Sequence, residues 1–395
     1  MNIQSKLLRI TTVPISLKTL LKGQHRFMKE KGFEVLGVSS AGAELDDVKE
    51  YEGIPVVVLE MTRTISPLKD LKALWQLYKL CKKEKPIIVH SHTPKAGAVG
   101  MLGAKLAGVP LRLHTVAGMP LLEATGTKRK ILDVVEKLTY ACATKVYPNS
   151  QGLYDFILQK NYTQKSKLKV IANGSSNGID TTFFAPEQVS SIQIEELKNQ
   201  LGITSNDFVF VFVGRLVGDK GINELVKVFS QHTNNYSSLT THKLLLVGSH
   251  ESELDPLAPE TLQIIANHPD IITVGFQKDV RPYFAISDVL VFPSYREGFP
   301  NVVMQAGAMG LPCIVSNING CNEIIIEGQN GVIIPVKTTE AIQRAMQKMI
   351  EDKDYYNQLK QNARSMIQSR YEQKVVWNAI LEEYNLLISK LEIRN

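Results

Sequence analysis

The chain has 395 residues, of which 44% are hydrophobic and 21% are charged. These values are ordinary for a soluble globular protein, and the length corresponds to about two domains. No stretch approaches the roughly 18 consecutive apolar residues of a membrane span. The N-terminal segment lacks an apolar core long enough for a signal peptide, and the four cysteines lack the spacing of a zinc site or a disulfide framework. We therefore predict a cytoplasmic protein of two domains.

Charge is distributed unevenly along the chain. Residues 1–185 carry 27 Lys and Arg against 15 Asp and Glu, whereas residues 186–395 carry 18 against 24. A basic first half predicts an anionic partner. Four basic residues recur at helical spacing beside leucines: Lys18, Lys22, Arg26 and Lys29. This pattern fits a basic amphipathic helix on anionic lipid, and equally a solvated helix face over a packed core. Because no nucleic-acid-binding module is recognisable, we expect no nucleic-acid partner.

Strand-like apolar runs alternate with longer helical runs throughout the chain. In the first half the predicted strands are Leu7–Thr12, Glu34–Ser39, Val56–Leu59, Ile87–His90, Leu111–Thr115, Lys145–Pro148 and Lys169–Ile171. In the second half they are Phe208–Val213, Lys243–Val247, Ile271–Gly275, Val289–Pro293, Pro312–Ser316 and Gly331–Ile334. This alternation predicts an α/β protein with two Rossmann-like domains, at residues 1–185 and 186–373, facing across a cleft. Ligands of such folds bind at the carboxyl ends of the strands.

The first domain contains the segment VHSHTPKAGAVG, Val89–Gly100, directly after a predicted buried strand. Strand alternation puts His90 and His92 on one face, so His92 either lines the cleft or is a structural histidine. Lys95, in the same segment, is a candidate partner for a phosphate. His114, on the next strand, is a candidate for the active site or for the core.

In the second domain, a predicted buried strand, FVFVFV, runs into a glycine-rich loop that carries Arg215 and Lys220. Cations at this point can neutralise a diphosphate leaving group, whose charge grows as the glycosidic bond breaks. The alternative is a pair of solvated loop cations.

The stretch Ser294–Ile325 runs from a strand into a turn with Arg296 and Glu297, followed by a helix with Pro300 predicted at its first position. Free amides at the start of a helix attract phosphate. Glu297, just upstream, could meet the hydroxyls of a group attached to that phosphate. The arrangement suits a nucleotide diphosphate that bears a sugar.

These motifs resemble those of glycosyltransferase family 4, retaining enzymes of the GT-B fold. Glu297 matches the first glutamate of the E-x7-E signature, and Arg215 with Lys220 matches the element G-R-x(4)-K-G. The segment H-x-H-T-P-K-A-G is similar to that of bacterial transferases that build polysaccharide repeat units on polyprenyl diphosphate. Two positions depart from the family: Gln305 replaces the second glutamate, and Ala117 stands where many relatives carry a histidine.

The resemblance implies a site residue by residue. Glu297, Arg215 and Lys220 would be catalytic. The donor-binding residues would be Gly214, Arg215, Lys220, Gly275, Phe276, Gln277, Lys278, Glu297, Gly298, Phe299, Pro300, Asn301, Val302 and Gln305. The acceptor-binding residues would be His92, Lys95 and His114. The C-terminal helical run, residues 374–395, would return to the first domain.

The resemblance also implies an activity. A hexose or N-acetylhexosamine would pass, with retention, from a nucleotide-diphosphate sugar, with UDP favoured, to a lipid-linked saccharide in capsule or O-antigen synthesis. No cofactor or metal is expected, and the basic first domain would meet the cytoplasmic face of the cell membrane. The alternatives are a catalytically silent nucleotide-sugar-binding subunit and a GT-B epimerase of UDP-N-acetylglucosamine.

Overall fold

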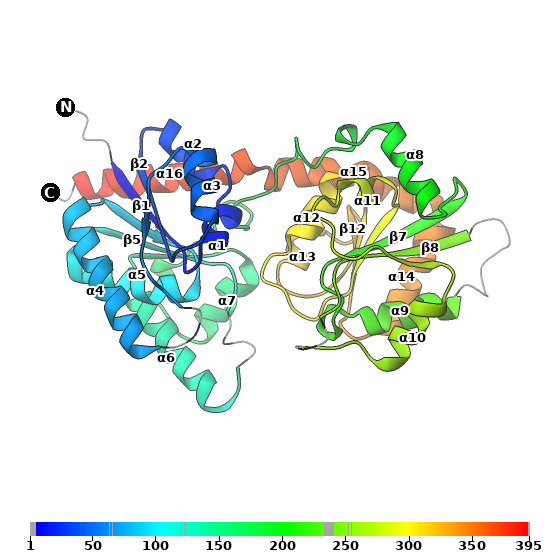
Figure 1. Ribbon diagram of the computed structural model, residues 1–395, viewed down its shortest axis with the longest axis horizontal. Coiled ribbons are helices and arrows are strands. Elements are labelled where there is room, and N and C mark those ends of the chain that lie inside the picture. The colour runs from blue at the N-terminus through cyan, green and yellow to red at the C-terminus, as the bar shows by residue number, and fades with distance from the viewer. Residues whose placement is uncertain are drawn as a thin grey trace. The chain divides into compact units, whose positions relative to one another are not determined.

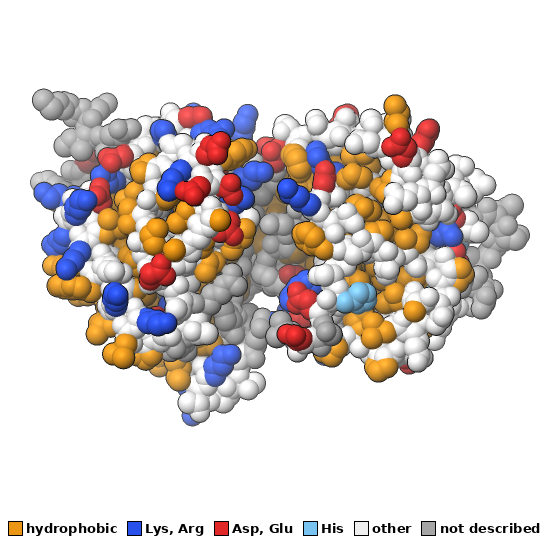
Figure 2. All heavy atoms as spheres, viewed as in Figure 1, with side chains coloured by type: hydrophobic (Ala, Val, Ile, Leu, Met, Phe, Trp, Pro, Cys, Tyr) orange, Lys and Arg blue, Asp and Glu red, His pale blue; other side chains and the backbone are white. Residues whose placement is uncertain are grey.

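The computed structural model describes residues 5–62, 64, 66–119, 121, 124–232, 241–251, 253 and 255–393 (Figure 1). The chain divides into two compact units. Unit 1 comprises residues 1–178 and 374–395, and unit 2 comprises residues 179–373. Residues 179–185, assigned to the first domain from the sequence, belong to unit 2, where Ile179 exchanges backbone hydrogen bonds with Tyr371 and Gln373. On the visible face of unit 1 many Lys and Arg side chains are spread over the surface (Figure 2).

Unit 1 is built on a parallel sheet of six strands in the order β3-β2-β1-β4-β5-β6. The strands are β1 (Lys6–Ile10), β2 (Glu34–Ser39), β3 (Val56–Val58), β4 (Ile88–Ser91), β5 (Leu111–Val116) and β6 (Lys145–Pro148). The predicted strand at Lys169–Ile171 is wrong. The chain forms only an isolated bridge there, between Leu168 and Val146, so it touches the edge strand β6 without extending the sheet.

Helices cover both faces of this sheet (Figure 1). One face carries α4 (Pro67–Glu84), α5 (Pro94–Ala107), α6 (Gly126–Cys142) and α7 (Gln151–Gln159). The other carries α1 (Pro14–Leu20), α2 (Gln24–Glu30), α3 (Glu44–Glu52) and α16 (Gln373–Glu392). Because successive strand residues point to opposite faces, Leu8 packs in the first core and Leu7 in the second. The predicted return of the C-terminal helix to the first unit is confirmed by α16.

The basic N-terminal stretch forms two helices and not one, and of the two interpretations left open the structure supports the solvated helix face over a packed core. Gly23 separates α1 from α2 with a φ of +79°, and a Cβ at this position would lie 2.5 Å from the Trp377 ring. Leu17 is fully buried in the core. Lys18 pairs with Asp47, which lies on α3. The apolar side of this stretch is therefore occupied by the unit's own core.

Unit 2 contains a second parallel sheet of six strands, in the order β12-β11-β10-β7-β8-β9. The strands are β7 (Asp207–Val213), β8 (Thr241–Val247), β9 (Ile271–Thr273), β10 (Val289–Phe292), β11 (Cys313–Ser316) and β12 (Gly331–Ile334). The helices are α8 (Ser191–Gln200), α9 (Ile222–His232), α10 (Pro259–Asn267), α11 (Arg281–Ala285), α12 (Asn301–Ala308), α13 (Cys321–Ile324), α14 (Thr339–Glu351) and α15 (Lys353–Tyr371). Each predicted strand of the second half is present.

In the described part of the chain, no helix combines the length and the apolar character that crossing a membrane requires.

Candidate active site

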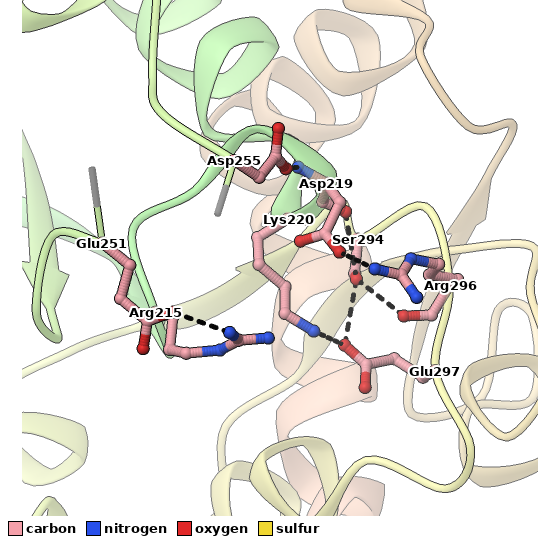
Figure 3. Close-up of polar contacts among 8 residues, drawn as sticks. All are labelled: Arg215, Asp219, Lys220, Glu251, Asp255, Ser294, Arg296 and Glu297. Atoms are coloured by element: carbon pink, nitrogen blue, oxygen red, sulfur yellow. Dashed lines mark hydrogen bonds and ion pairs between the residues drawn. The ribbon is translucent and has the colours of Figure 1, made fainter. Parts of the chain in front are cut away.

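Two charged turns of unit 2 meet at the carboxyl ends of β7 and β10, which are neighbours in the sheet (Figure 3). Lys220, at the end of the loop after β7, donates a hydrogen bond to Glu297 Oε1 in the turn after β10. Both side chains are largely buried, with 14% and 16% of their surfaces exposed. The two segments singled out in the sequence, 77 residues apart, therefore form one site.

Ser294 also binds the Glu297 carboxylate. Its side chain is fully buried at the end of β10, and its hydroxyl donates to Glu297 Oε1 over 2.9 Å. Lys220 and Ser294 thus hold the same carboxylate oxygen, and within the described residues Oε2 has no hydrogen-bond partner. Ser294 opens the stretch singled out in the sequence but precedes the E-x7-E signature, and no sequence signal distinguishes it from any other serine after a strand.

A second set of contacts ties the two turns together. The backbone N–H of Asp219 donates to Asp255 Oδ2 over 2.5 Å, and Asp219 Oδ2 accepts from Arg296 Nη2 over 2.7 Å. The Tyr295 N–H also donates to the carbonyl of Asp219, over 2.8 Å. Sequence reasoning missed Asp219 and Asp255, because their importance depends on contacts between distant segments.

Arg215 occupies the start of the same loop and is about half exposed. It forms an ion pair of 2.8 Å with Glu251, which follows β8 (Figure 3). The loop leaves the sheet at Gly214, whose N–H donates to the Val247 carbonyl over 2.9 Å. The predicted cations Arg215 and Lys220 therefore lie at one edge of the sheet, each held by a carboxylate.

Helix α12 follows the turn that carries Glu297. Pro300 is the residue before the helix, not its first residue as predicted, and the helix begins at Asn301. The first amides of a helix have no acceptor within the helix, so those of Asn301 and Val302 can bind an anion. Asn319 fixes the preceding turn by donating to the Gly298 carbonyl over 2.5 Å. Gln305 lies one turn into α12 and is half-buried.

The predicted donor-binding segment Gly275–Lys278 follows β9. Gly275 adopts a φ of +67°, and its carbonyl accepts from the Gly248 N–H over 2.9 Å. Gln277 donates to the Val274 carbonyl over 2.7 Å, and the Phe276 ring is 75% exposed. Lys278 continues this turn. The segment therefore lies at the same sheet edge, beside the loop that follows β8.

The predicted acceptor residues of unit 1 are held inside that unit. His92 and His114 are 4% and 3% exposed. The His92 ring lies 4.1 Å from the ring of His90, which contacts the Tyr384 hydroxyl at 2.5 Å. Burial lowers the pKa of His92 well below its usual value and that of His114 to about 4. Lys95 forms an ion pair of 2.5 Å with Asp70.

Within the described residues, no group of three or more His, Cys, Asp or Glu side chains is arranged to hold a metal ion.

Comparison with known proteins identifies the class. A family model described as "Glycosyl transferases group 1" matches residues 193–366, and one described as "Glycosyl transferase 4-like domain" matches residues 25–174. With its two parallel sheets, the chain belongs to the family 4 glycosyltransferases of the GT-B fold, of the surface-polysaccharide type.

Three known proteins make the likeness concrete. The capsular polysaccharide biosynthesis glycosyltransferase CapM of Staphylococcus aureus is 32% identical over 98% of both chains. An Escherichia coli UDP-Gal:alpha-D-GlcNAc-diphosphoundecaprenol alpha-1,3-galactosyltransferase is 31% identical over 91% of this chain and 92% of its own. The crystal structure of Anabaena HepE in complex with UDP and glucose superposes with a TM-score of 0.77 at 20% identity, covering 96% and 99% of the two chains.

Proposed function

We propose that this glycosyltransferase moves a hexose or N-acetylhexosamine from a UDP-linked donor, with retention, to a lipid-linked saccharide in capsule or related polysaccharide synthesis. The observation that carries the proposal is the buried Lys220–Glu297 pair at the carboxyl ends of adjacent strands. The donor and the acceptor class are supported by the E. coli relative, whose name specifies UDP-galactose and a diphosphoundecaprenol-linked sugar. HepE, which has the same fold, binds UDP.

Lys220, Arg215 and the first amides of α12 would bind the donor diphosphate. As the bond between the anomeric carbon and the phosphate oxygen breaks, negative charge grows on the leaving UDP, and these groups stabilise it more in the transition state than in the bound donor. Lys220 is held in place by Glu297 before the donor arrives, so little reorganisation is needed.

Glu297 would hold hydroxyls of the donor sugar through Oε2, the oxygen that Lys220 and Ser294 leave open. Retaining glycosidases place two carboxylates about 5–5.5 Å apart and use one as a nucleophile, whereas this site centres on a single sequence-predicted carboxylate. We therefore propose front-face displacement. The acceptor oxygen bonds to the anomeric carbon on the face that UDP leaves, and the departing phosphate takes the acceptor's proton.

We propose that transfer needs no metal or cofactor, since Lys220, Arg215 and the α12 amides already supply positive charge for the diphosphate. For the acceptor, we propose that unit 1 contributes Lys95; His92 and His114, predicted beside it, are buried within the unit. Lys95 would exchange its bond to Asp70 for a phosphate of the lipid-linked acceptor. We further propose that the protein works at the cytoplasmic face of the membrane, where such an acceptor is anchored.

Thermal unfolding with UDP, GDP and their common sugar conjugates, with and without EDTA, tests the donor site. A ligand at 100 times its dissociation constant adds about 2.7 kcal/mol to the free energy of unfolding. We expect UDP compounds to stabilise the protein equally with and without EDTA. Lys220→Ala should abolish the effect, whereas Lys227→Ala, an exposed lysine of α9, should keep it.

Two outcomes would contradict the proposal. If no nucleotide stabilises the protein, the replacement of the second glutamate by Gln305 has abolished donor binding, and a catalytically silent assembly subunit becomes the better interpretation. If UDP-sugars bind but Lys220→Ala binds them equally, the site is elsewhere. Anomeric configuration of the product, read by NMR, separates retention from inversion, and a donor returned as its epimer would indicate an epimerase.

A further inference from the structure

Helix α4 exposes an apolar stripe to solvent. Leu68, Leu71 and Trp75 follow each other at intervals of three and four residues, which places them on one side of the helix. They are 86%, 63% and 56% exposed. The opposite side, with Leu77 and Cys81, is buried against the sheet. The helix therefore has two apolar sides, and only one of them is used by the fold.

Helix α6 repeats this pattern. Ile131, Val134 and Leu138 have the same spacing and are 44%, 65% and 49% exposed. The buried side of α6 includes Glu136 and Tyr140. Both helices pack on α5 and cover the same face of the sheet (Figure 1). Since the buried sides face the sheet, the exposed stripes face away from it.

Basic residues outnumber acidic ones on these two helices, nine to four. The two helices contribute basic residues around the stripes: Lys69, Lys72, Lys79, Lys82 and Lys83 on α4, and Lys128, Lys130 and Lys137 on α6. Their four acidic residues are paired or buried: Asp70 pairs with Lys95, Glu84 with Lys6 and Asp133 with Arg129, and Glu136 is buried. The solvent-exposed side of α4 and α6 therefore presents mainly apolar and basic side chains.

The aromatic residues of α4 have an interfacial arrangement. Trp75 stacks on Tyr78 with ring centroids 5.1 Å apart, and the Lys79 ammonium lies 5.3 Å from the centre of the Trp75 ring. Tryptophan, tyrosine and lysine are enriched where protein meets the boundary between lipid headgroups and acyl chains.

We propose that this surface, formed by Leu68, Leu71 and Trp75 of α4, Ile131, Val134 and Leu138 of α6 and the lysines around them, docks on an anionic lipid bilayer. Apolar stripes would enter the headgroup boundary while the lysines attract acidic lipids. The inference rests on the proposed function, since a lipid-linked acceptor requires the enzyme at a membrane. This surface takes the place of the N-terminal stretch as the predicted membrane contact, because Leu17 and Leu21 of that stretch are buried and Lys18 is paired.

Vesicle flotation tests the surface directly. We expect the protein to float with vesicles of phosphatidylglycerol and phosphatidylcholine but weakly with phosphatidylcholine alone, and high salt should reduce binding. The double variant Leu71→Glu/Val134→Glu should bind at least about tenfold more weakly, because two charges enter the apolar stripes. The matched control Ile192→Glu/Leu262→Glu, at exposed apolar positions of unit 2, should bind like the parent.

Trp75 supplies a second readout. Its emission should shift to the blue on binding and be quenched by lipids brominated in the acyl chain. The proposal is overturned if the parent protein does not float, if both double variants bind equally, or if sedimentation shows a dimer that Leu71→Glu/Val134→Glu dissociates. Stabilisation by UDP, measured on the same samples, separates the docking proposal from the proposed donor site. A parent protein that is stabilised by UDP but does not float refutes only the docking proposal. A parent protein that floats but is not stabilised by UDP refutes only the donor site.

Discussion

Gly221 lies where the loop after β7 meets the end of β10. It adopts a φ of +71°, and a Cβ there would lie 2.3 Å from the Pro293 carbonyl oxygen. The close approach of these two segments allows Lys220 to reach Glu297. A residue with no side chain is therefore as much a part of the site as the ion pair.

Gly221→Ala should lower the free energy of unfolding by about 3 kcal/mol, the sum of left-handed strain and a steric clash, and should weaken UDP binding. Gly202→Ala is the matched control. Gly202 also has a positive φ, +64°, but its Cβ would meet nothing within 4 Å, so only the strain of about 1 kcal/mol remains. Urea unfolding followed by circular dichroism measures both. Equal losses would show that the approach to Pro293 is unimportant.

The sequence motifs indicated which charged side chains form the candidate site but not which residues hold those side chains in place. Arg215, Lys220 and Glu297 stand in recognisable patterns. Ser294 and Asp219 do not, because a serine after a strand or an aspartate in a loop is common, and only folding brings each onto its partner.

At the scale of elements, α16 completes unit 1 from the far end of the chain. Tyr384 is fully buried, and its hydroxyl contacts His90 Nδ1 on β4. The Glu383 carboxylate accepts from the Tyr147 hydroxyl over 3.2 Å, beside its bond to Lys169. The helix is therefore anchored by polar contacts as well as by the apolar core.

Tyr384→Phe should lower the free energy of unfolding by about 1–2 kcal/mol, because His90 Nδ1 loses its partner in a buried setting. Tyr51→Phe, at a side chain 52% exposed, should change it by less than about 0.5 kcal/mol. Midpoints of urea unfolding measure the difference. Similar values for both variants would show that the contact with His90 adds nothing to the anchoring of α16.

Elements with a strong local signal were predictable, and those with a weak one were not. The run FVFVFV predicted β7 because a buried parallel strand is apolar on both faces. The Lys169–Ile171 prediction failed because this run pairs with the edge strand β6 only at an isolated bridge and the chain turns at Ala172, which has a φ of +50°. The split between α1 and α2 falls at Gly23, where Trp377 of α16 leaves no room for a side chain.

At the scale of the whole molecule, unit 1 contains both of the chain's tryptophans, Trp75 and Trp377, so tryptophan fluorescence follows its unfolding. The unit also buries several histidines. Burial, with a smaller contribution from the Arg9 charge, lowers the pKa of His25 to about 3, and burial lowers the pKa of His114 to about 4. The fold therefore keeps these histidines neutral at neutral pH.

Unit 1 should lose stability in mild acid. As the pH falls below about 6.5, histidines are protonated in the unfolded chain but stay neutral in the folded one, so the free energy of unfolding decreases. The decrease ends at about pH 4 for His114 and about pH 3 for His25, where the folded residues are protonated too. Between pH 7.5 and pH 5.5 each of these two histidines should lower the free energy of unfolding by about 1 kcal/mol. Urea unfolding by tryptophan fluorescence at both pH values measures this, and His114→Gln should reduce the pH dependence by one histidine's share. An unchanged dependence would contradict the assignment.

The sequence by itself determined that the chain holds two parallel α/β units and where the charged turns of unit 2 lie, since strand periodicity, glycine loops and charged turns are encoded in contiguous residues. Only the tertiary structure decided that Lys220 is held by Glu297, that His92 and His114 are buried, and that α4 and α6, not the N-terminal helices, expose apolar stripes among lysines. Those outcomes depend on contacts between residues far apart in the chain, and burial is settled only when the whole unit packs.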